Sequence, residues 1–129
     1  MYPKALLPHS PAAIELAELA ELPLIGIGDS GPMGQLLWQQ LQGVGVHPSS
    51  TVQVDTYFVA ARLVAEGLGV CPLDQLTAIG NPDNQVGVAQ LLPELAVPIR
   101  ALHLNSRPLN KLSQAFLQQV TATIKAIHN

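Results

Sequence analysis

Three glycines at a predicted strand-to-helix junction are the first residues of this chain whose spacing could do chemistry. Gly26, Gly28 and Gly31 form a G-x-G-x-x-G pattern within "PLIGIGDSGPMGQLL". In a dinucleotide-binding fold such glycines let the backbone approach a pyrophosphate at a helix N-terminus, and an acid after the next strand binds the ribose. Asp55 closes the next predicted strand, "TVQVD", so the pattern is typical of a nucleotide site.

The rest of the chain fits a nucleotide site poorly. Asp55 follows Gly26 at a longer distance than the usual separation of about 20 residues. The residues after Asp55 are also too few to supply both a second βαβαβ half and a substrate domain. A small nucleotide-binding enzyme is therefore the less favoured alternative.

No other group of residues predicts catalysis or a metal site. Cys71 has no histidine at a recognisable spacing, which favours a buried structural thiol over a nucleophile. No pair of carboxylates has a spacing that suggests acid–base catalysis. The histidines show no metal-ligand pattern and are His9, His47, His103 and His128. We therefore expect no catalytic residue, no metal and no cofactor, in a protein that is not an enzyme.

Length and charge limit the class of protein. The 129 residues suffice for one domain with one core. Charged residues make up only 12% of the chain, against about 25% in a typical soluble domain. So weakly charged a surface predicts that another subunit or a further domain covers part of it.

Charge and hydropathy patterning also exclude several partners. The net charge is −3, and the six Lys and Arg residues are scattered singly, which leaves no basic stripe for nucleic acid. No apolar run approaches the ~20 residues of a membrane span, and the N-terminus lacks a signal-peptide pattern. One cysteine fits a reducing compartment. We expect a cytoplasmic protein that binds neither nucleic acid nor a membrane.

Apolar periodicity, with glycine and proline as punctuation, predicts strands that alternate with helices. The predicted strands cover residues 4–8, 24–27, 51–55, 68–73 and 99–104, and the predicted helices cover residues 12–22, 33–41, 56–66 and 110–127. This order predicts parallel pairing with right-handed crossovers. The expected fold class is α/β, with a small three-layer, parallel-rich sheet and helices on both faces.

Ligands bind at the carboxyl ends of the strands in such sheets. Two of these ends carry Gly28, Asp29 and Ser30, and then Asp55 and Thr56. Asp55 or Thr56 could serve as the N-cap of the helix 56–66, could contact a ligand, or could do both. That helix is apolar almost all round, so we expect a subunit or domain to cover the side that its own sheet does not.

Three segments of the chain resemble LysR-type transcriptional regulators. "DTYFVAARLVAEGLGVCPLDQL" resembles the family segment in which a helix ends in V-A-x-G-L-G-V and enters a strand that closes with proline. "LLPHSPAAIELAELAELPLIG" resembles the crossover strand, its H-x-P turn and the short helix before P-L-I. "RPLNKLSQAFLQQVTATI" resembles the C-terminal helix. The resemblance covers nearly the whole chain.

The resemblance implies the second subdomain of a periplasmic-binding-protein-like effector domain. Residues 4–8 and 99–104 would be the two crossover strands, and the helix 110–127 would pack on the first subdomain. Nothing in the chain resembles the family's DNA-binding domain, its linker helix or most of the first subdomain. A single domain over residues 1–129 is therefore expected, as a truncated part of a regulator that senses a small molecule.

The family places effector contacts and dimer contacts on matching segments. The residues that would contact an effector are Gly28, Asp29, Ser30, Asp55, Thr56 and Tyr57. The residues that would line a homodimer interface are Val52, Val54, Phe58, Ala61, Arg62 and Ala65. The alternative from another class is a stand-alone dimerising interaction module that binds no ligand.

Overall fold

Residues 1–28, 31–46 and 50–128 are described in the computed structural model of the chain. Their contacts divide the chain between Val97 and Pro98 into two units, which we call the body (residues 1–97) and the arm (residues 98–129). The single domain expected over residues 1–129 stays a prediction. All strands found among the described residues belong to the body.

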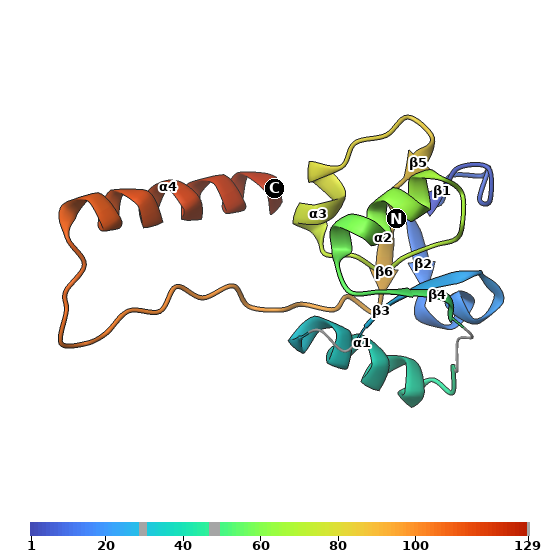
Figure 1. Ribbon diagram of the computed structural model, residues 1–129, viewed down its shortest axis with the longest axis horizontal. Coiled ribbons are helices and arrows are strands. Elements are labelled where there is room, and N and C mark those ends of the chain that lie inside the picture. Colours follow the sequence, from blue (N-terminus) through green and yellow to red (C-terminus); the bar gives the residue numbers. More distant parts are fainter. Residues whose placement is uncertain (29–30, 47–49, 129) are drawn as a thin grey trace. The chain divides into compact units, whose positions relative to one another are not determined.

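The body contains short strands and helices, which alternate from η1 to α2 (Figure 1). Their order is β1 (Tyr2–Pro3), β2 (Ala13–Glu15), the 3-10 helix η1 (Leu16–Glu21), β3 (Leu24–Ile27), α1 (Pro32–Gly43), β4 (Ser50–Val54), α2 (Tyr57–Ala65), α3 (Gln75–Gly80), β5 (Val86–Gly87) and β6 (Gln90–Leu92). The arm contains α4 (Lys111–His128).

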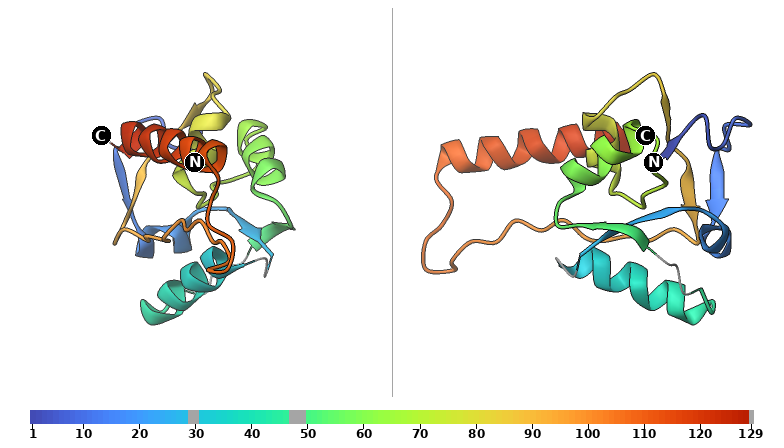
Figure 2. Two further views of the ribbon diagram at one scale, coloured as in Figure 1. Left: turned by 90° about the vertical axis from the view of Figure 1, so that its left-hand side faces the viewer. Right: turned by 45° about the vertical axis from the view of Figure 1, so that its right-hand side comes forward.

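β3 and β4 form a parallel pair at the centre of the body, as the sequence predicts. Ile25 pairs with Val52, and Ile27 pairs with Val54. α1 lies on one side of this pair and α2 lies on the other (Figures 1 and 2). The layers confirm the predicted α/β class with helices on both faces of parallel strands.

Local signals explain where the two flanking helices begin and end. α1 has proline at its first position, and it is followed by Gly45 with φ +72°. α2 ends before Gly67, which has φ +82° and whose N–H donates to the Val64 carbonyl at 2.9 Å. The N–H of Leu68 donates to the Leu63 carbonyl at 3.1 Å, so these bonds satisfy carbonyls at the helix end. Both helices therefore end where the sequence predicts.

The predicted strand 68–73 is much shorter in the structure. Val70 forms a single parallel bridge with Leu24, through Val70 N–H to Pro23 O at 2.8 Å and Ile25 N–H to Val70 O at 2.9 Å. Pro72, two residues later, has no N–H to donate, so the ladder does not extend beyond this bridge.

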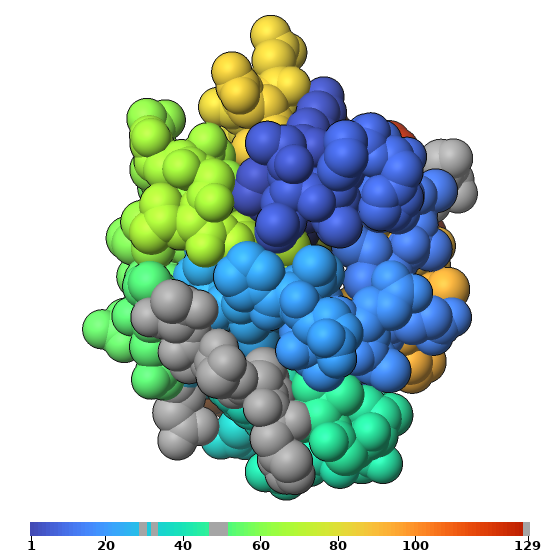
Figure 3. Space-filling view, turned by 90° about the vertical axis from the view of Figure 1, so that its right-hand side faces the viewer, coloured from blue at the N-terminus to red at the C-terminus, as the bar shows by residue number. Residues whose placement is uncertain are grey.

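Two further strand pairs join segments that are distant in sequence. β2 lies parallel to β6, and β1 lies antiparallel to β5. The N–H of Lys4 also donates to the Gln85 carbonyl at 2.8 Å, and Figure 3 shows the N-terminal segment against the segment that leads into β5. These two pairs connect the N-terminal segment of the body to its last two strands.

The core of the body consists of two apolar clusters. One contains Tyr2, Ile14, Leu16, Leu19, Leu24, Leu41, Val46 and Val70. The other contains Ile25, Ile27, Ala60, Val64, Cys71 and Val86. Ile25 and Leu24 are neighbours on β3 and belong to different clusters, because successive side chains of a strand point to opposite faces.

Two predictions in the N-terminal third are wrong. Residues 4–8 form turns instead of a strand, and the N–H groups of Leu6 and Leu7 both donate to the Pro3 carbonyl, at 3.0 and 3.2 Å. The predicted helix 12–22 is replaced by β2 and η1. Burying Ile14 and Leu16 at a spacing of two residues lets β2 pair with β6, and this tertiary contact overrides helix propensity.

The arm matches the prediction only in its helix. Residues 99–104 form no strand, and they have no paired strand among the described residues, so no ladder satisfies their backbone. α4 is present as predicted, and Asn110 Oδ1 accepts from the N–H of Ser113 at 2.8 Å as its N-terminal cap. Among the described residues we find no helix with the length and hydropathy that a bilayer crossing requires.

Candidate functional site

The carboxyl ends of β3 and β4 lie side by side in the body. The N–H of Gly28 donates to the Val54 carbonyl at 2.7 Å, one step beyond the paired residues Ile27 and Val54. A Cβ atom at Gly28 would lie 3.0 Å from Asp55 Oδ1. The structure therefore brings together two of the predicted site residues, Gly28 and Asp55. We call this place the β3–β4 edge and define it by Gly28, Asp55, Thr56 and Tyr57.

The residues at the β3–β4 edge differ in exposure. Gly28 is buried, while Asp55 and Thr56 are exposed. Position 28 has little room for a side chain, and glycine there permits the close approach to the Asp55 carboxylate. Asp29 and Ser30, which the sequence also places here, lie outside the described residues.

Thr56 is the N-cap of α2. Its hydroxyl oxygen accepts from the N–H of Val59 at 3.3 Å, and its backbone is extended. Of the two candidates that the sequence offers for this cap, Asp55 and Thr56, the structure selects Thr56. The cap ties the β3–β4 edge to the first turn of α2.

Replacing Thr56 by alanine is expected to lower the free energy of unfolding by about 1 kcal/mol, because the N–H of Val59 loses its acceptor. Thr56→Ser is the matched control, since it keeps the hydroxyl and should lose less than half as much. Urea denaturation followed by circular dichroism measures both variants. Equal losses in the two variants would contradict the cap.

Tyr57 is the half-buried member of the β3–β4 edge, and it packs against the same cluster as Leu73. Its ring packs against the cluster that contains Ile25 and Cys71. Burial, and then the negative charge of Asp74, raises the pKa of the Tyr57 hydroxyl. The hydroxyl is therefore a neutral hydrogen-bond donor at physiological pH.

Asp74 is a residue that the sequence interpretation missed. Its carboxylate accepts from the N–H of Thr77 at 2.9 Å and from the Thr77 hydroxyl at 2.6 Å, which caps α3. The signal was present in "DQLT", an aspartate three residues before a threonine at the start of a helix. Leu73, at the end of the predicted strand 68–73, packs against the same cluster as Tyr57, so this strand end lies near the β3–β4 edge.

Cys71 is a buried thiol, as the sequence predicts. It is 1% exposed, and burial raises the pKa of the thiol to about 12. A nucleophilic cysteine needs the opposite shift, because the thiolate is the reactive form. The described residues contain no group of three or more His, Cys, Asp and Glu side chains that could hold a metal ion.

The pH dependence of stability tests the burial of Cys71. Its folded-state pKa, about 12, lies above the value of about 8.5 for an unfolded thiol, so its stabilising contribution is complete below that pH. This contribution is lost as the pH rises from about 8.5 toward 12, because only the unfolded chain ionises there. We expect the unfolding free energy of the wild type to fall relative to Cys71→Ala over this range. Parallel curves for the two proteins would contradict the assignment.

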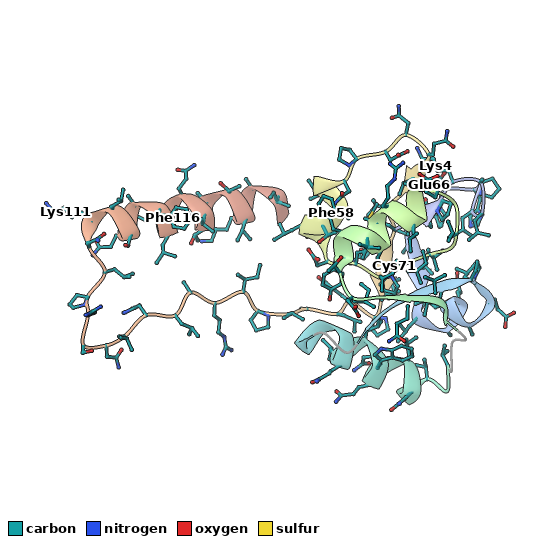
Figure 4. The ribbon with its side chains drawn as sticks, in the orientation of Figure 1. Lys4, Phe58, Glu66, Cys71, Lys111 and Phe116 are labelled. Atoms are coloured by element: carbon teal, nitrogen blue, oxygen red, sulfur yellow. The ribbon has the colours of Figure 1, made fainter. Side chains whose placement is uncertain are left out.

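α2 presents one buried face and one exposed face. Ala60 and Val64 are fully buried, whereas Phe58 is 73% exposed and Val59 is 48% exposed. Figure 4 shows Phe58 at the end of α2 that follows β4. The sequence of α2 is apolar almost all round, but the described residues cover only one side of this helix.

The predicted dimer residues of α2 and β4 differ in exposure. Phe58 and Arg62 are exposed, and Arg62 forms an i,i+4 ion pair with Glu66. Ala61 is 3% exposed and offers almost no surface to a partner, because it packs inside the body. The remaining candidates are half-buried and are Val52, Val54 and Ala65.

Comparison with known proteins assigns the family. The chain matches the LysR substrate binding domain family over residues 3–125. It belongs to this family. It is also 41% identical over 124 residues to a protein named HTH-type transcriptional regulator DgcR from Pseudoalteromonas sp., an alignment that covers 96% of this chain and 43% of that relative. The chain therefore spans less than half the length of this relative. A search of the solved structures found no significant match.

Family membership confirms the resemblance found in the sequence. The fold is periplasmic-binding-protein-like α/β, and the chain corresponds to a LysR substrate binding domain over residues 3–125. LysR-type regulators are generally dimeric, bind small-molecule effectors and are generally not enzymes. The nucleotide-binding enzyme and the stand-alone interaction module gain no support from these findings.

Proposed function

We propose that the chain senses a small molecule at the β3–β4 edge and that the longer protein uses this signal to regulate transcription. The observation that carries the proposal is the juxtaposition of Gly28 and Asp55, in a chain that matches a substrate-binding family over residues 3–125. Ligands bind at this end of parallel strands because backbone N–H groups and loop side chains converge there. The β3–β4 edge is the part of the fold best suited to bind an effector.

The proposed effector contacts combine neutral donors with one carboxylate. Thr56 and Tyr57 supply hydroxyl groups, and Asp55 supplies a charge. The full proposed set is Gly28, Asp29, Ser30, Asp55, Thr56 and Tyr57. We propose no catalytic residue, no metal and no cofactor, so the site binds its ligand without reacting with it.

The β3–β4 edge would be one wall of a cleft, because the chain corresponds to the second effector subdomain. The opposite wall and the DNA-binding part would belong to other parts of the longer protein, consistent with the 43% of the relative that the chain covers.

The arm would pack on the first subdomain. An open apolar groove of about 510 Å³ between residues 101–103 and α4, lined by Leu102, Leu112 and Phe116 among others, supports this packing role. It contains few polar groups that could orient an effector.

The exposed face of α2 would contribute to a homodimer. Phe58 and Val59 are apolar residues that water otherwise solvates, and burying them against a second subunit is favourable. Four further residues would lie in or beside the interface: Val52, Val54, Arg62 and Ala65.

A regulator that acts on DNA would work in the cytoplasm, and this chain itself would bind neither DNA nor a membrane.

Ligand binding to the full-length protein tests the proposed site. A thermal-shift panel of small metabolites identifies a stabilising compound, and calorimetry then gives its dissociation constant. Asp55→Asn should weaken binding by about tenfold or more, since a hydrogen bond to a charged group contributes about 1.5–3 kcal/mol. Glu18→Gln, on the exposed side of η1, is the matched control and should bind like the wild type.

Two results would contradict the proposed function. Dimerisation with no stabilising compound in the panel would favour the interaction module. Saturable binding of NAD or NADP that is lost in Gly28→Val would favour the nucleotide-binding enzyme.

A further inference from the structure

We infer that Gln53 is a further ligand contact at the β3–β4 edge, and that Gln53 and Asp55 together select a carboxylic acid with an amino or hydroxyl group on the adjacent carbon. This inference rests on the proposed function, because it takes the edge as the effector site. It adds a specificity-determining residue and a chemical class of ligand.

Gln53 and Asp55 flank Gly28. A Cβ atom at Gly28 would lie 3.0 Å from Asp55 Oδ1 and 3.6 Å from Gln53 Nε2. The two side chains are two residues apart at the end of an extended strand, so they project to the same face. Both are exposed, while Gly28 is buried. One small polar group of a ligand placed above Gly28 can therefore reach both side chains.

These two side chains offer opposite hydrogen-bonding groups. Gln53 Nε2 donates, whereas Asp55 Oδ1 accepts and carries negative charge. The Gln53 side-chain amide forms no hydrogen bond with another described residue. A carboxylate has about four lone-pair sites, so Asp55 can accept from a ligand in addition to its contacts within the chain. The pair therefore fits a ligand that presents a donor and an acceptor side by side.

The helix beside this pair favours a carboxylate as the acceptor of the ligand. Gly28 is four residues after Leu24, so it lies on the face of β3 that packs with α1. A Cβ atom at Gly34, in the first turn of α1, would lie 3.6 Å from the Gly28 carbonyl oxygen. The N-terminus of a helix stabilises a negative group, so a carboxylate here gains from α1 and from the Gln53 amide. The adjacent carbon then carries the amino or hydroxyl group that donates to Asp55.

Thermal shifts of the full-length protein test the ligand class with two series of compounds, each built on one carbon skeleton. The first series is propionate, lactate and alanine, and the second is succinate, malate and aspartate, with each chiral member as a racemate. Within a series the carbon next to the carboxylate carries no donor, then a hydroxyl, then an ammonium group. We expect the rise in melting temperature to increase in that order, because a charged donor forms the stronger hydrogen bond with the Asp55 carboxylate. Equal shifts within both series, or no shift in either, would overturn the class.

Calorimetry with the most stabilising compound of the two series tests Gln53. Gln53→Glu keeps the length of the side chain and replaces the donor by a carboxylate, so the dissociation constant should rise about tenfold or more. Gln53→Ala removes the donor without adding charge and should raise the constant less. Gln90→Glu is the matched control and should bind like the wild type, because Gln90 is an exposed glutamine on β6, which pairs with β2.

The outcomes separate this inference from the proposed function. If Asp55→Asn weakens binding while both Gln53 variants bind like the wild type, the role of Gln53 is overturned and the β3–β4 edge is still the effector site. If Asp55→Asn and both Gln53 variants all bind like the wild type, the proposed site fails and the inference fails with it. Circular dichroism confirms folding, and where the glutamate variant does not fold, the alanine variant decides.

Discussion

Replacing Gly69 by alanine is expected to lower the free energy of unfolding by about 3 kcal/mol, at the upper end of overpacking costs. A Cβ atom at Gly69 would lie 2.3 Å from the carbonyl oxygen of Pro23 and 3.1 Å from its carbonyl carbon. Both are backbone atoms, and the Pro23 oxygen also accepts from the N–H of Val70 at 2.8 Å. The close approach cannot be relieved without breaking the bridge between Val70 and Leu24.

Gly43→Ala is the control for the Gly69 variant. Outside its own helix, no described residue has a heavy atom within 4 Å of a Cβ at Gly43. Alanine also favours helix, so stability should stay equal or rise by up to about 1 kcal/mol. Chemical denaturation of both variants gives the comparison. If the Gly69 variant were as stable as the Gly43 variant, the approach of residue 69 to Pro23 would be disproved.

Replacing Leu41 by alanine is expected to cost about 2–5 kcal/mol of unfolding free energy, the range for a leucine removed from a close-packed core. Leu41 is 0% exposed and anchors α1 in the cluster that contains Leu24 and Val46. Val88→Ala is the matched control, because Val88 is 60% exposed in the same body, and it should change stability by no more than about 0.5 kcal/mol. Similar losses in both variants would show that α1 does not pack on the body as described.

The central part of the fold could be predicted from sequence because its signals are local. Glycines after the helices, Thr56 before α2 and the apolar run of β3 fix β3, α1, β4 and α2 within a few residues. α4 could be predicted equally well, since its cap and its apolar stripe lie within one segment.

The remaining elements depend on contacts that are distant in sequence. β1 and β2 are two or three residues long, and they exist because β5 and β6 pair with them. Residues 99–104 alternate as a strand does, but no described strand pairs with them, so the pattern alone does not form one. Periodicity detects which residues avoid water and cannot detect which segment will cover them.

The candidate site likewise combines features that the sequence predicts with features that depend on contacts distant in sequence. The β3–β4 edge follows from parallel pairing, which places Gly28 beside Asp55 without any further information. The approach of Asp74 to Tyr57 could not be predicted, because it depends on where the chain turns after Val70. The exposure of Phe58 and the burial of Ala61 likewise depend on how α2 is rotated against β3.

Hydrogen–deuterium exchange on the full-length protein tests the central claim, effector binding at the β3–β4 edge, most directly. The probe is the small metabolite that raises the melting temperature most in the thermal-shift panel. We predict slower exchange in peptides that cover residues 24–31 and 51–60 when this compound is bound. Protection confined to the arm, with no change at the β3–β4 edge, would contradict the proposed site.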